Sequence, residues 1–389
     1  MKKSAVVIFF SVFFSVYGLL NAYIFVHAWN ALGEGGVAKA VFAACFVVLA
    51  TSFIGGRFLE RRWISVVSTA LIWVGSFWLA AMLYFFLACL LVDLLGLVGL
   101  LIPSAGIWLG QISGSSSRDL LVAAIVLVAL LLAYGHLNAV RPRVVHLKLE
   151  IRKPIPGGKF SIAMASDLHL GTIVGPRRCE EIVKALNALD ADVILLPGDL
   201  VDEDLGPVIR ANLGETLRGL AAPNGVYAVT GNHEYIGGVE PAVRYLRDHG
   251  VKMLRDEFAV LPCGITIVGR EDRSATMGGV RRKELRQILE GVDRTRPVIL
   301  LDHQPFRLQE AADAGIDLQL SGHTHHGQLW PLNFITRAVY EVSWGYLKKR
   351  DTHYYVSSGV GSWGPPARIG NRPEVIKIEV VSTAVTAER

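Results

Sequence analysis

The first 140 residues of this 389-residue chain consist largely of apolar stretches that are long enough to cross a lipid bilayer as helices. The bilayer core offers no water to backbone N–H and C=O groups, so a spanning segment must satisfy them internally, as a helix of about 20 apolar residues does. The candidate spans are residues 5–28, 40–54, 64–87 and 120–137. A cleaved signal peptide is the rival interpretation of the first span, but this apolar run exceeds a usual signal core and further spans follow it.

Residues 90–110 form another apolar stretch, in which Asp93 is the only charged residue. Three interpretations stay open for this stretch: it extends the third helix, re-enters the bilayer, or forms a fifth crossing. A fifth crossing would place the basic residues after the last helix on the non-cytoplasmic side. A four-span arrangement therefore fits the charge pattern better.

Clusters of Lys and Arg determine the expected orientation in the membrane. They flank alternate ends of a four-span arrangement: Lys2 and Lys3, then Arg57, Arg61 and Arg62, then Arg141, Arg143 and Lys148. Because cytoplasmic loops carry an excess of these residues, we expect an integral protein of the inner or plasma membrane whose residues 141–389 face the cytoplasm. The four cysteines are widely spaced, a usage that needs no disulfide and suits a reducing compartment.

Composition supports a division into a membrane region and a water-soluble region. A mean hydropathy of +0.40 with 52% hydrophobic residues is high for a soluble enzyme, and the apolar excess lies before residue 140. We predict a transmembrane helical region at 1–140, a linker at 141–156 that contains the first strand, and one domain at 157–389. A net charge of +5 is small for a nucleic-acid surface, so no nucleic-acid partner is expected.

In residues 157–389, a polar motif follows each of several short apolar runs that are typical of buried strands. The runs are residues 160–165, 193–196, 226–229 and 298–301. The motifs are Asp167-Leu168-His169, Gly198-Asp199-Leu200-Val201-Asp202, Gly231-Asn232-His233-Glu234, Asp302-His303 and, further on, Ser321-Gly322-His323-Thr324-His325-His326. Loops at the carboxyl ends of strands converge while the sheet holds them rigid, so these motifs are expected to form one site.

Helical patterns alternate with these strands and indicate a layered α/β sandwich. The helix candidates are residues 177–189, 208–220, 241–248, 283–291 and 306–314. A strand-rich tail at 354–381 is expected to complete a second sheet.

The types of the candidate ligands point to metal chemistry. Asp, His and Asn without Cys form a mixed nitrogen and oxygen set, for which manganese is our first choice and iron, zinc or magnesium are alternatives. The candidates are Asp167, His169, Asp199, Asn232, His303, His323 and His325. They are too many for one ion and suffice for two that share a carboxylate. Two cations roughly 3.5–4 Å apart can clamp a phosphoryl group and turn a bridging water into a hydroxide nucleophile, which indicates phosphoester hydrolysis.

These motifs resemble, in order, the pattern D-x-H, G-D-x-x-D, G-N-H-D/E, H, G-H-x-H of the calcineurin-like metallophosphoesterases, in particular a membrane-associated bacterial subgroup. The resemblance covers residues 158–382 and implies a four-layer αββα sandwich, here preceded by an all-α transmembrane region. It implies that Asp167, His169 and His325 hold one metal ion, that Asn232, His303 and His323 hold the other, and that Asp199 bridges both.

The resemblance also implies roles for residues close to the substrate. His233 would lie over the phosphate, stabilising charge or protonating the leaving oxygen, with Glu234 as its orienting partner. Asp202 would support the ligands. The segment from Tyr355 to Arg368 matches the closing segment of the same subgroup, and Arg368 would bind the substrate phosphate; a surface or salt-bridged arginine is an equal alternative.

Two further features of the sequence need an interpretation: the histidine at position 326 and the composition of residues 330–350. The subgroup motif G-H-T-H-G-G-Q reads G-H-T-H-H-G-Q here, and we interpret His326 as a tolerated surface residue rather than an extra ligand. Residues 330–350 interleave aromatic and basic side chains, a mixture that a membrane interface favours. The alternative is an ordinary loop whose aromatic rings fill the domain core.

The sequence therefore predicts a membrane-anchored, dinuclear metal-dependent phosphoesterase that cleaves a phosphodiester or pyrophosphate bond. Its expected partners are the bilayer and a phosphoester substrate that is amphiphilic, either lipid-linked or part of the cell envelope. The alternative is a catalytically degenerate membrane scaffold or sensor. The presence of every expected ligand and of His233 disfavours that alternative.

Overall fold

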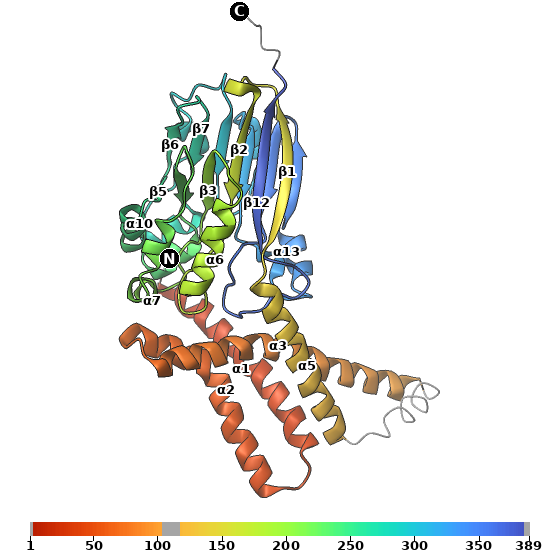
Figure 1. The fold of residues 1–389 in the computed structure, drawn as a ribbon. Helices are drawn as coiled ribbons and strands as arrows, with labels where there is room; N and C mark the ends of the chain where they lie inside the picture. The colour runs from red at the N-terminus through yellow and green to blue at the C-terminus, as the bar shows by residue number, and fades with distance from the viewer. Residues whose placement is uncertain (1–2, 103–116, 385–389) are drawn as a thin grey trace, which may run out of the picture. The chain divides into compact units, whose positions relative to one another are not determined.

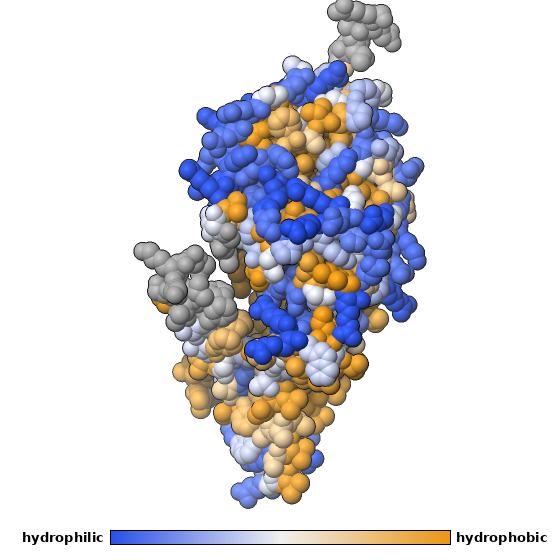
Figure 2. Space-filling model, turned by 90° about the vertical axis from the view of Figure 1, so that its left-hand side faces the viewer, coloured by the Kyte–Doolittle hydropathy of each residue, from blue (hydrophilic) through white to orange (hydrophobic). Residues whose placement is uncertain are grey.

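The computed structural model describes residues 3–102 and 117–384 (Figure 1). Contacts divide the chain into two compact units. One comprises residues 1–136 together with 364–367, and the other comprises residues 137–363 and 368–389. On the face shown in Figure 2, apolar residues cover most of the helical unit, whereas the second unit is mainly hydrophilic.

The helical unit contains four helices that are long and apolar enough to cross a membrane, which confirms the predicted number among the described residues. They are α1 (Lys3–Ala31), α2 (Gly36–Arg62), α3 (Val66–Leu101) and α5 (Ser117–Ala139). The helix α3 runs through Asp93 to Leu101, so the described part of 90–110 extends the third helix. Residues 103–110 of that stretch lie outside the described residues.

Polar and close-packed contacts join the first three helices. Asp93 on α3 lies 3.2 Å from His27 Nε2 and accepts a hydrogen bond from the hydroxyl of Tyr23, both on α1. Between α2 and α3, a side chain at Gly75 would overlap the backbone of Phe53. Such small residues let helix backbones approach closely where no hydrophobic driving force exists between helices in lipid.

The second unit is built on two six-stranded sheets. In order, the first sheet contains β1 (Arg143–Ile151), β12 (Glu374–Ser382), β2 (Lys159–Met164), β3 (Val193–Pro197), β4 (Val226–Val229) and β5 (Lys252–Met253). The second contains β10 (Gly345–Lys349), β11 (Thr352–Val356), β9 (Leu318–Ser321), β8 (Val298–Leu301), β7 (Thr266–Gly269) and β6 (Glu257–Val260). Strands β2 to β5 run parallel, as do β7, β8, β9 and β11. The motif-bearing strands of each sheet therefore end at one edge.

Helices cover the sheets and make four layers, so the predicted fold class is confirmed. The first sheet packs against α6 (Pro176–Asn187), α7 (Leu205–Arg210), α8 (Leu213–Leu217) and α10 (Val239–Asp248), and the second against α11 (Leu285–Ile288) and α12 (Leu308–Asp313). Side chains along β3 point alternately to the two faces of the sheet and so contribute to two hydrophobic cores. Leu195 faces the core between the sheets, whereas Ile194 and Leu196 face the helices.

Three predictions of local structure differ from what is observed. Residues 208–220 do not form one helix, because Asn212 adopts a left-handed conformation with φ 51° that separates α7 from α8. The helix expected at 283–291 is reduced to α11. The tail does not complete one sheet: β11 joins the second sheet and β12 the first. Within the expected linker, residues 143–151 form β1, which pairs with β12 along its whole length.

Candidate metal centre

The predicted ligands lie in the loops that follow strands of both sheets. Asp167 and His169 follow β2, and Asp199 follows β3. Asn232 begins the short helix α9 (Asn232–Gly237) after β4. On the second sheet, His303 follows β8, while His323 and His325 follow β9, the latter at the start of the 3-10 turn η3 (His325–Gly327). Loops from three neighbouring parallel strands of the first sheet and two of the second are thereby brought together, as expected from the sequence.

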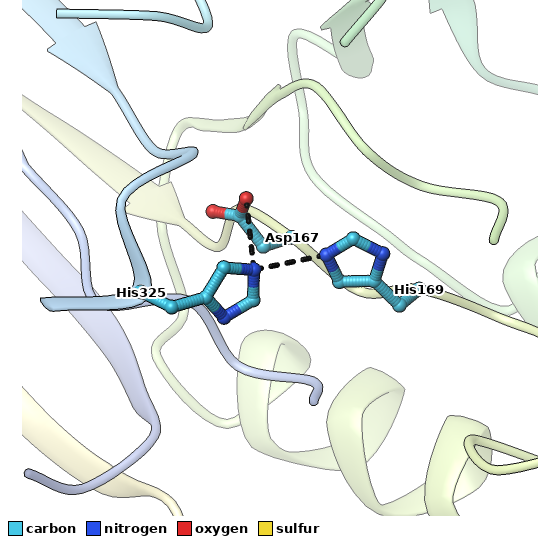
Figure 3. A group of neighbouring side chains, drawn as sticks. All are labelled: Asp167, His169 and His325. Carbon is cyan, nitrogen blue, oxygen red and sulfur yellow. Dashed lines mark hydrogen bonds and ion pairs between the residues drawn. The ribbon is translucent and has the colours of Figure 1, made fainter. Parts of the chain in front are cut away.

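Asp167, His169 and His325 form a first group of buried side chains (Figure 3). The Nε2 atoms of the two histidines are 3.0 Å apart. His325 Nε2 also lies 3.5 Å from Asp167 Oδ1. Figure 3 shows the two imidazole edges and the carboxylate pointing toward one another, which is the arrangement of ligands around a common centre.

Asp199, His303 and His323 form a second group. Asp199 Oδ2 lies 3.1 Å from His303 Nε2. Asn232 Oδ1 is 2.7 Å from His323 Nδ1 and 3.3 Å from His303 Nε2, which adds the amide to the group. The other ring nitrogen of His303 lies 2.8 Å from the carbonyl oxygen of Pro197. That contact lets Nδ1–H donate to the carbonyl and leaves Nε2 as the ring atom available to a metal ion.

Asp199 links the two groups. Its Oδ2 is 3.9 Å from His169 Nε2 on the side of the first group, as well as 3.1 Å from His303 on the side of the second. Its Oδ1 accepts a hydrogen bond of 2.9 Å from the backbone N–H of His233. The structure thus brings all seven predicted ligands into one continuous cluster.

Unusual backbone conformations hold these side chains in place. Five of the seven predicted ligands have positive φ: Asp167, His169, Asp199, His323 and His325. The left-handed region is sparsely populated by residues other than glycine, although Asp and His tolerate it better than most, and such conformations concentrate at functional sites. Glycines give the carboxylates room, because a side chain at Gly322 would overlap Asp167 and one at Gly231 would overlap Asp199.

Burial and charge set the protonation of these groups. Burial and the nearby His303 lower the pKa of His323 to about 4, which leaves a neutral ring able to bind a metal. Burial acts to raise the pKa of Asp199, but His303 and His233 outweigh it and hold this pKa well below its usual range. Burial acts to lower the pKa of His233, yet Asp199 and Asp202 outweigh it and raise this pKa to about 9.

The partner of His233 is Asp202, whose Oδ1 lies 3.2 Å from His233 Nδ1. Glu234, expected in that role, instead accepts hydrogen bonds from the backbone N–H groups of Leu200 and Val201 at 2.8 and 2.9 Å, and from Gly231 at 2.7 Å. The expectation that Glu234 orients His233 does not match this geometry. The carboxylate of Glu234 connects the loop after β3 to the loop after β4.

Arg368 is completely buried, so neither direct substrate binding nor a surface position fits its environment. Its guanidinium donates to the carbonyl oxygens of Ser358 at 2.6 Å and Gly361 at 2.5 Å, and Nη2 lies 3.0 Å from His325 Nδ1. The closing segment folds its carbonyl groups around the guanidinium. Arg368 therefore positions the predicted ligand His325 through the contact with its Nδ1 atom.

His326 is also buried, which corrects the expectation of a surface residue. Its backbone keeps a left-handed conformation, with φ 46°, although a side chain is present. The ring packs against Trp344 with centroids 5.3 Å apart, and Nδ1 lies 2.9 Å from the hydroxyl of Ser343. Among the described residues, His326 does not belong to any of the groups of side chains that could hold a metal ion.

The structure also places side chains at the site that the sequence pattern did not single out. The ring of Trp363 lies 6.1 Å from that of His233, and the ring of Tyr340 lies 6.0 Å from that of His323. Gln328 binds the backbone of Trp363 on both sides. Gln328 is the last residue of the subgroup motif G-H-T-H-G-G-Q, so the sequence could have indicated that it matters. No spacing in the sequence indicated that it contacts residue 363.

Comparison with known proteins agrees with this geometry. The profile of the family described as calcineurin-like phosphoesterase matches residues 160–327. A protein of Aquifex aeolicus named uncharacterized metallophosphoesterase is 34% identical over 258 residues, which cover 65% of this chain and 97% of that protein. A protein of Danio rerio named transmembrane protein with metallophosphoesterase domain is 32% identical over 280 residues, covering 68% of this chain and 63% of its own length.

Among solved structures, a dimetal phosphatase from Danio rerio aligns with 58% of this chain and 99% of its own, at 12% identity and a TM-score of 0.34. The sequence relatives carry the assignment. Since the Aquifex aeolicus relative is matched over almost its whole length, and the family profile spans the loops that hold all seven clustered side chains, the chain belongs to the calcineurin-like phosphoesterase family.

Proposed function

We propose that this protein is a membrane-anchored phosphoesterase that binds two divalent metal ions and cleaves a phosphodiester or pyrophosphate bond in an amphiphilic substrate. The observation that carries the proposal is the position of Asp199, whose Oδ2 lies 3.9 Å from His169 of the first group and 3.1 Å from His303 of the second. A single ion would need only one of these groups.

The donor set fits two divalent ions. Imidazole edges and carboxylates are buried and turned toward common centres, an arrangement that is costly unless a cation compensates the carboxylate charges. Asp167, His169 and His325 would hold one ion, Asn232, His303 and His323 the other, and Asp199 both. Manganese is our first choice, with iron, zinc and magnesium as alternatives. When bound, the two ions would polarise the phosphoryl group and supply a nucleophile from water near neutral pH.

His233 would be the proton donor for the leaving oxygen. Asp202 holds its ring from one side, and the hydrogen bond from its backbone N–H to Asp199 fixes it relative to the shared carboxylate. In the proposed reaction, water loses one proton to the solvent, and its oxygen bonds to phosphorus. The P–O bond to the leaving group breaks, and the leaving oxygen keeps that electron pair and takes the proton from His233.

An exposed apolar surface next to the metal centre supports an amphiphilic substrate. The helix α13 (Asn333–Val339) follows the turn that carries His325 and has no buried residue. Phe334, Ile335 and Val339 are 58, 60 and 56% exposed, and Trp330 just before them is 50% exposed. These side chains do not fill the domain core, and such a patch on a membrane-anchored protein is suited to the bilayer interface.

The alternative function, a membrane scaffold or sensor with a degenerate phosphoesterase domain, has less support. Degeneration is expected to remove ligands or the proton donor first, because a scaffold has no need for buried imidazoles and carboxylates that converge. Every one of these side chains is present and clustered here.

Replacing Asp199 by Asn should remove both metal ions and the activity, because the shared ligand loses its charge and the two cations repel one another. Elemental analysis of the purified protein measures the metal content. Asp190→Asn is the matched control, since Asp190 is exposed and also has positive φ, and it should keep both ions. Retention of one full equivalent of metal in the Asp199 variant would show that the two sites are independent.

Replacing His233 by Ala should lower turnover by roughly 10²–10⁴-fold while the metal content stays at two ions per chain, because a proton donor is lost and no ligand is. The loss should shrink for nitrophenolate leaving groups, which need little protonation. His146→Ala, on the exposed side of β1, is the control. Loss of metal from the His233 variant would instead make this histidine a ligand, and an equal loss for all leaving groups would favour purely electrostatic stabilisation.

The proposed orientation places the phosphoesterase unit in the cytoplasm, as the three basic clusters indicate. Arg177→Cys, on the exposed surface of α6, should react with a membrane-impermeant maleimide only after spheroplasts are lysed. Glu34→Cys, between α1 and α2, should react before lysis because it lies at the opposite end of the first span. Both variants are made in a cysteine-free background. Labelling of residue 177 in intact spheroplasts would reverse the topology.

Replacing both Phe334 and Ile335 by Ser should reduce hydrolysis of a vesicle-held phosphodiester by about tenfold or more, the loss expected when partial burial of two apolar side chains is removed. Hydrolysis of a small soluble phosphodiester should stay within about twofold of wild type by the same estimate. Val260→Ser, at a residue on β6 that is 60% exposed, is the control. Equal impairment with both substrates would assign α13 a structural role only.

A further inference from the structure

Trp363 is a large apolar side chain that stays half exposed at the metal centre. Trp363 is 50% exposed, whereas most residues of the surrounding closing segment are buried. Its ring stands edge to face against His233, with centroids 6.1 Å apart and planes at 78°. An indole in that position is available to a bound molecule without any rearrangement of the core.

Gln328 holds Trp363 in place from behind. The side-chain amide of Gln328 accepts a hydrogen bond of 3.1 Å from the backbone N–H of Trp363 and donates one of 2.8 Å to its carbonyl oxygen. Gln328 is itself buried and lies three residues after His325. The backbone of Trp363 is therefore fixed to the turn that carries a predicted ligand, so the ring is an ordered feature of the site and not a loose surface side chain.

The position beside His233 assigns Trp363 to one side of the reacting phosphorus. In the proposed function, His233 gives its proton to the leaving oxygen, so the leaving group must lie on the side of His233. Tyr340, 6.0 Å from His323, stands beside the other ligand group. The part of the substrate that departs would thus meet the indole face, whereas the part that stays on phosphorus would lie nearer Tyr340.

The surroundings of Trp363 favour an apolar chain over a nucleobase as the group it contacts. A base-specific site needs polar groups that can read base edges, and both ends of the Gln328 amide are engaged by the backbone of Trp363. The next residues in the chain are Gly364, Pro365 and Pro366, and the prolines have no backbone N–H to offer.

We propose that Trp363 is a specificity-determining residue that binds an apolar chain on the leaving group, so that the enzyme prefers phosphoesters whose alcohol or phosphate leaving group is lipid-linked. The proposal rests on the proposed phosphoesterase function and deepens it. Trp363 would select substrates by the apolar chain on the leaving group, whereas α13 would attach the protein to the bilayer.

A series of soluble methyl 4-alkylphenyl phosphates, with alkyl groups from ethyl to octyl, tests the proposal without a membrane. The leaving-group pKa stays nearly constant along the series, so only the chain changes. In the wild-type protein, kcat/KM should rise by up to about fourfold for each added methylene that is buried against the ring. Trp363→Ala should flatten this rise mainly through KM, and Trp363→Phe should keep part of it. Val260→Ala should leave the rise unchanged.

A second measurement does not depend on turnover. A methylphosphonate with an octyl chain that ends in a photoreactive diazirine should label residues 361–363, with the site located by mass spectrometry of the digested protein. Labelling at Trp363 in a preparation that hydrolyses none of the esters would refute the proposed reaction while retaining the apolar subsite.

Several outcomes would overturn the proposal. The same dependence of kcat/KM on chain length in wild type and Trp363→Ala would remove the role of the ring. A preference for nucleoside leaving groups over octylphenol that is lost in the alanine variant would assign the ring to a base. Loss of metal in both Trp363 variants, together with equal losses for all chain lengths, would make its role structural.

Discussion

The carboxylate of Asp199 is the interaction on which the site depends. A buried carboxylate is costly without compensation. The Oδ2 atom of this one lies near both His303 and His169, while its Oδ1 accepts the backbone N–H of His233. It can sit there because Gly231 has no side chain to occupy the same space. One acidic group thereby joins the loops after β3, β4 and β8, and the remaining predicted ligands are arranged around it.

Groups that do not touch the centre of the cluster hold it together from outside. Glu234 joins two loops through three backbone N–H groups, and Arg368 gathers the closing segment behind His325. Glu374, at the start of β12, is fully buried and accepts from Arg143, Trp344 and Ser358. Glu234 binds backbone N–H groups, whereas Glu374 binds side chains as well as backbone. They act as supports of the loops, which leaves the imidazole edges and the oxygens of Asp167 and Asp199 facing inward.

Much of the fold and nearly the whole ligand cluster could be predicted from sequence, because both follow from local patterns. A short apolar run followed by Asp167 or Asp199 indicates a buried strand and the loop at its end, and parallel strands bring such loops together. The failures concern partners that are distant in sequence. Nothing near Arg368 indicates that carbonyl groups of residues 358 and 361 will surround it, and nothing near His326 indicates that Trp344 will cover it. Asn212 breaks a helix that its neighbours favour, because a left-handed residue ends one element and begins another.

The left-handed backbone at five of the predicted ligands has a consequence for the life of the protein in the cell. Each such conformation costs on the order of 1 kcal/mol where it is not glycine, and a typical domain is stable by only about 5–15 kcal/mol. Ions that bind the folded site and not the unfolded chain stabilise the fold by mass action. We therefore expect the half-life of this protein against cellular proteases to follow the supply of the proposed metal ions, so that metal starvation would lower its abundance.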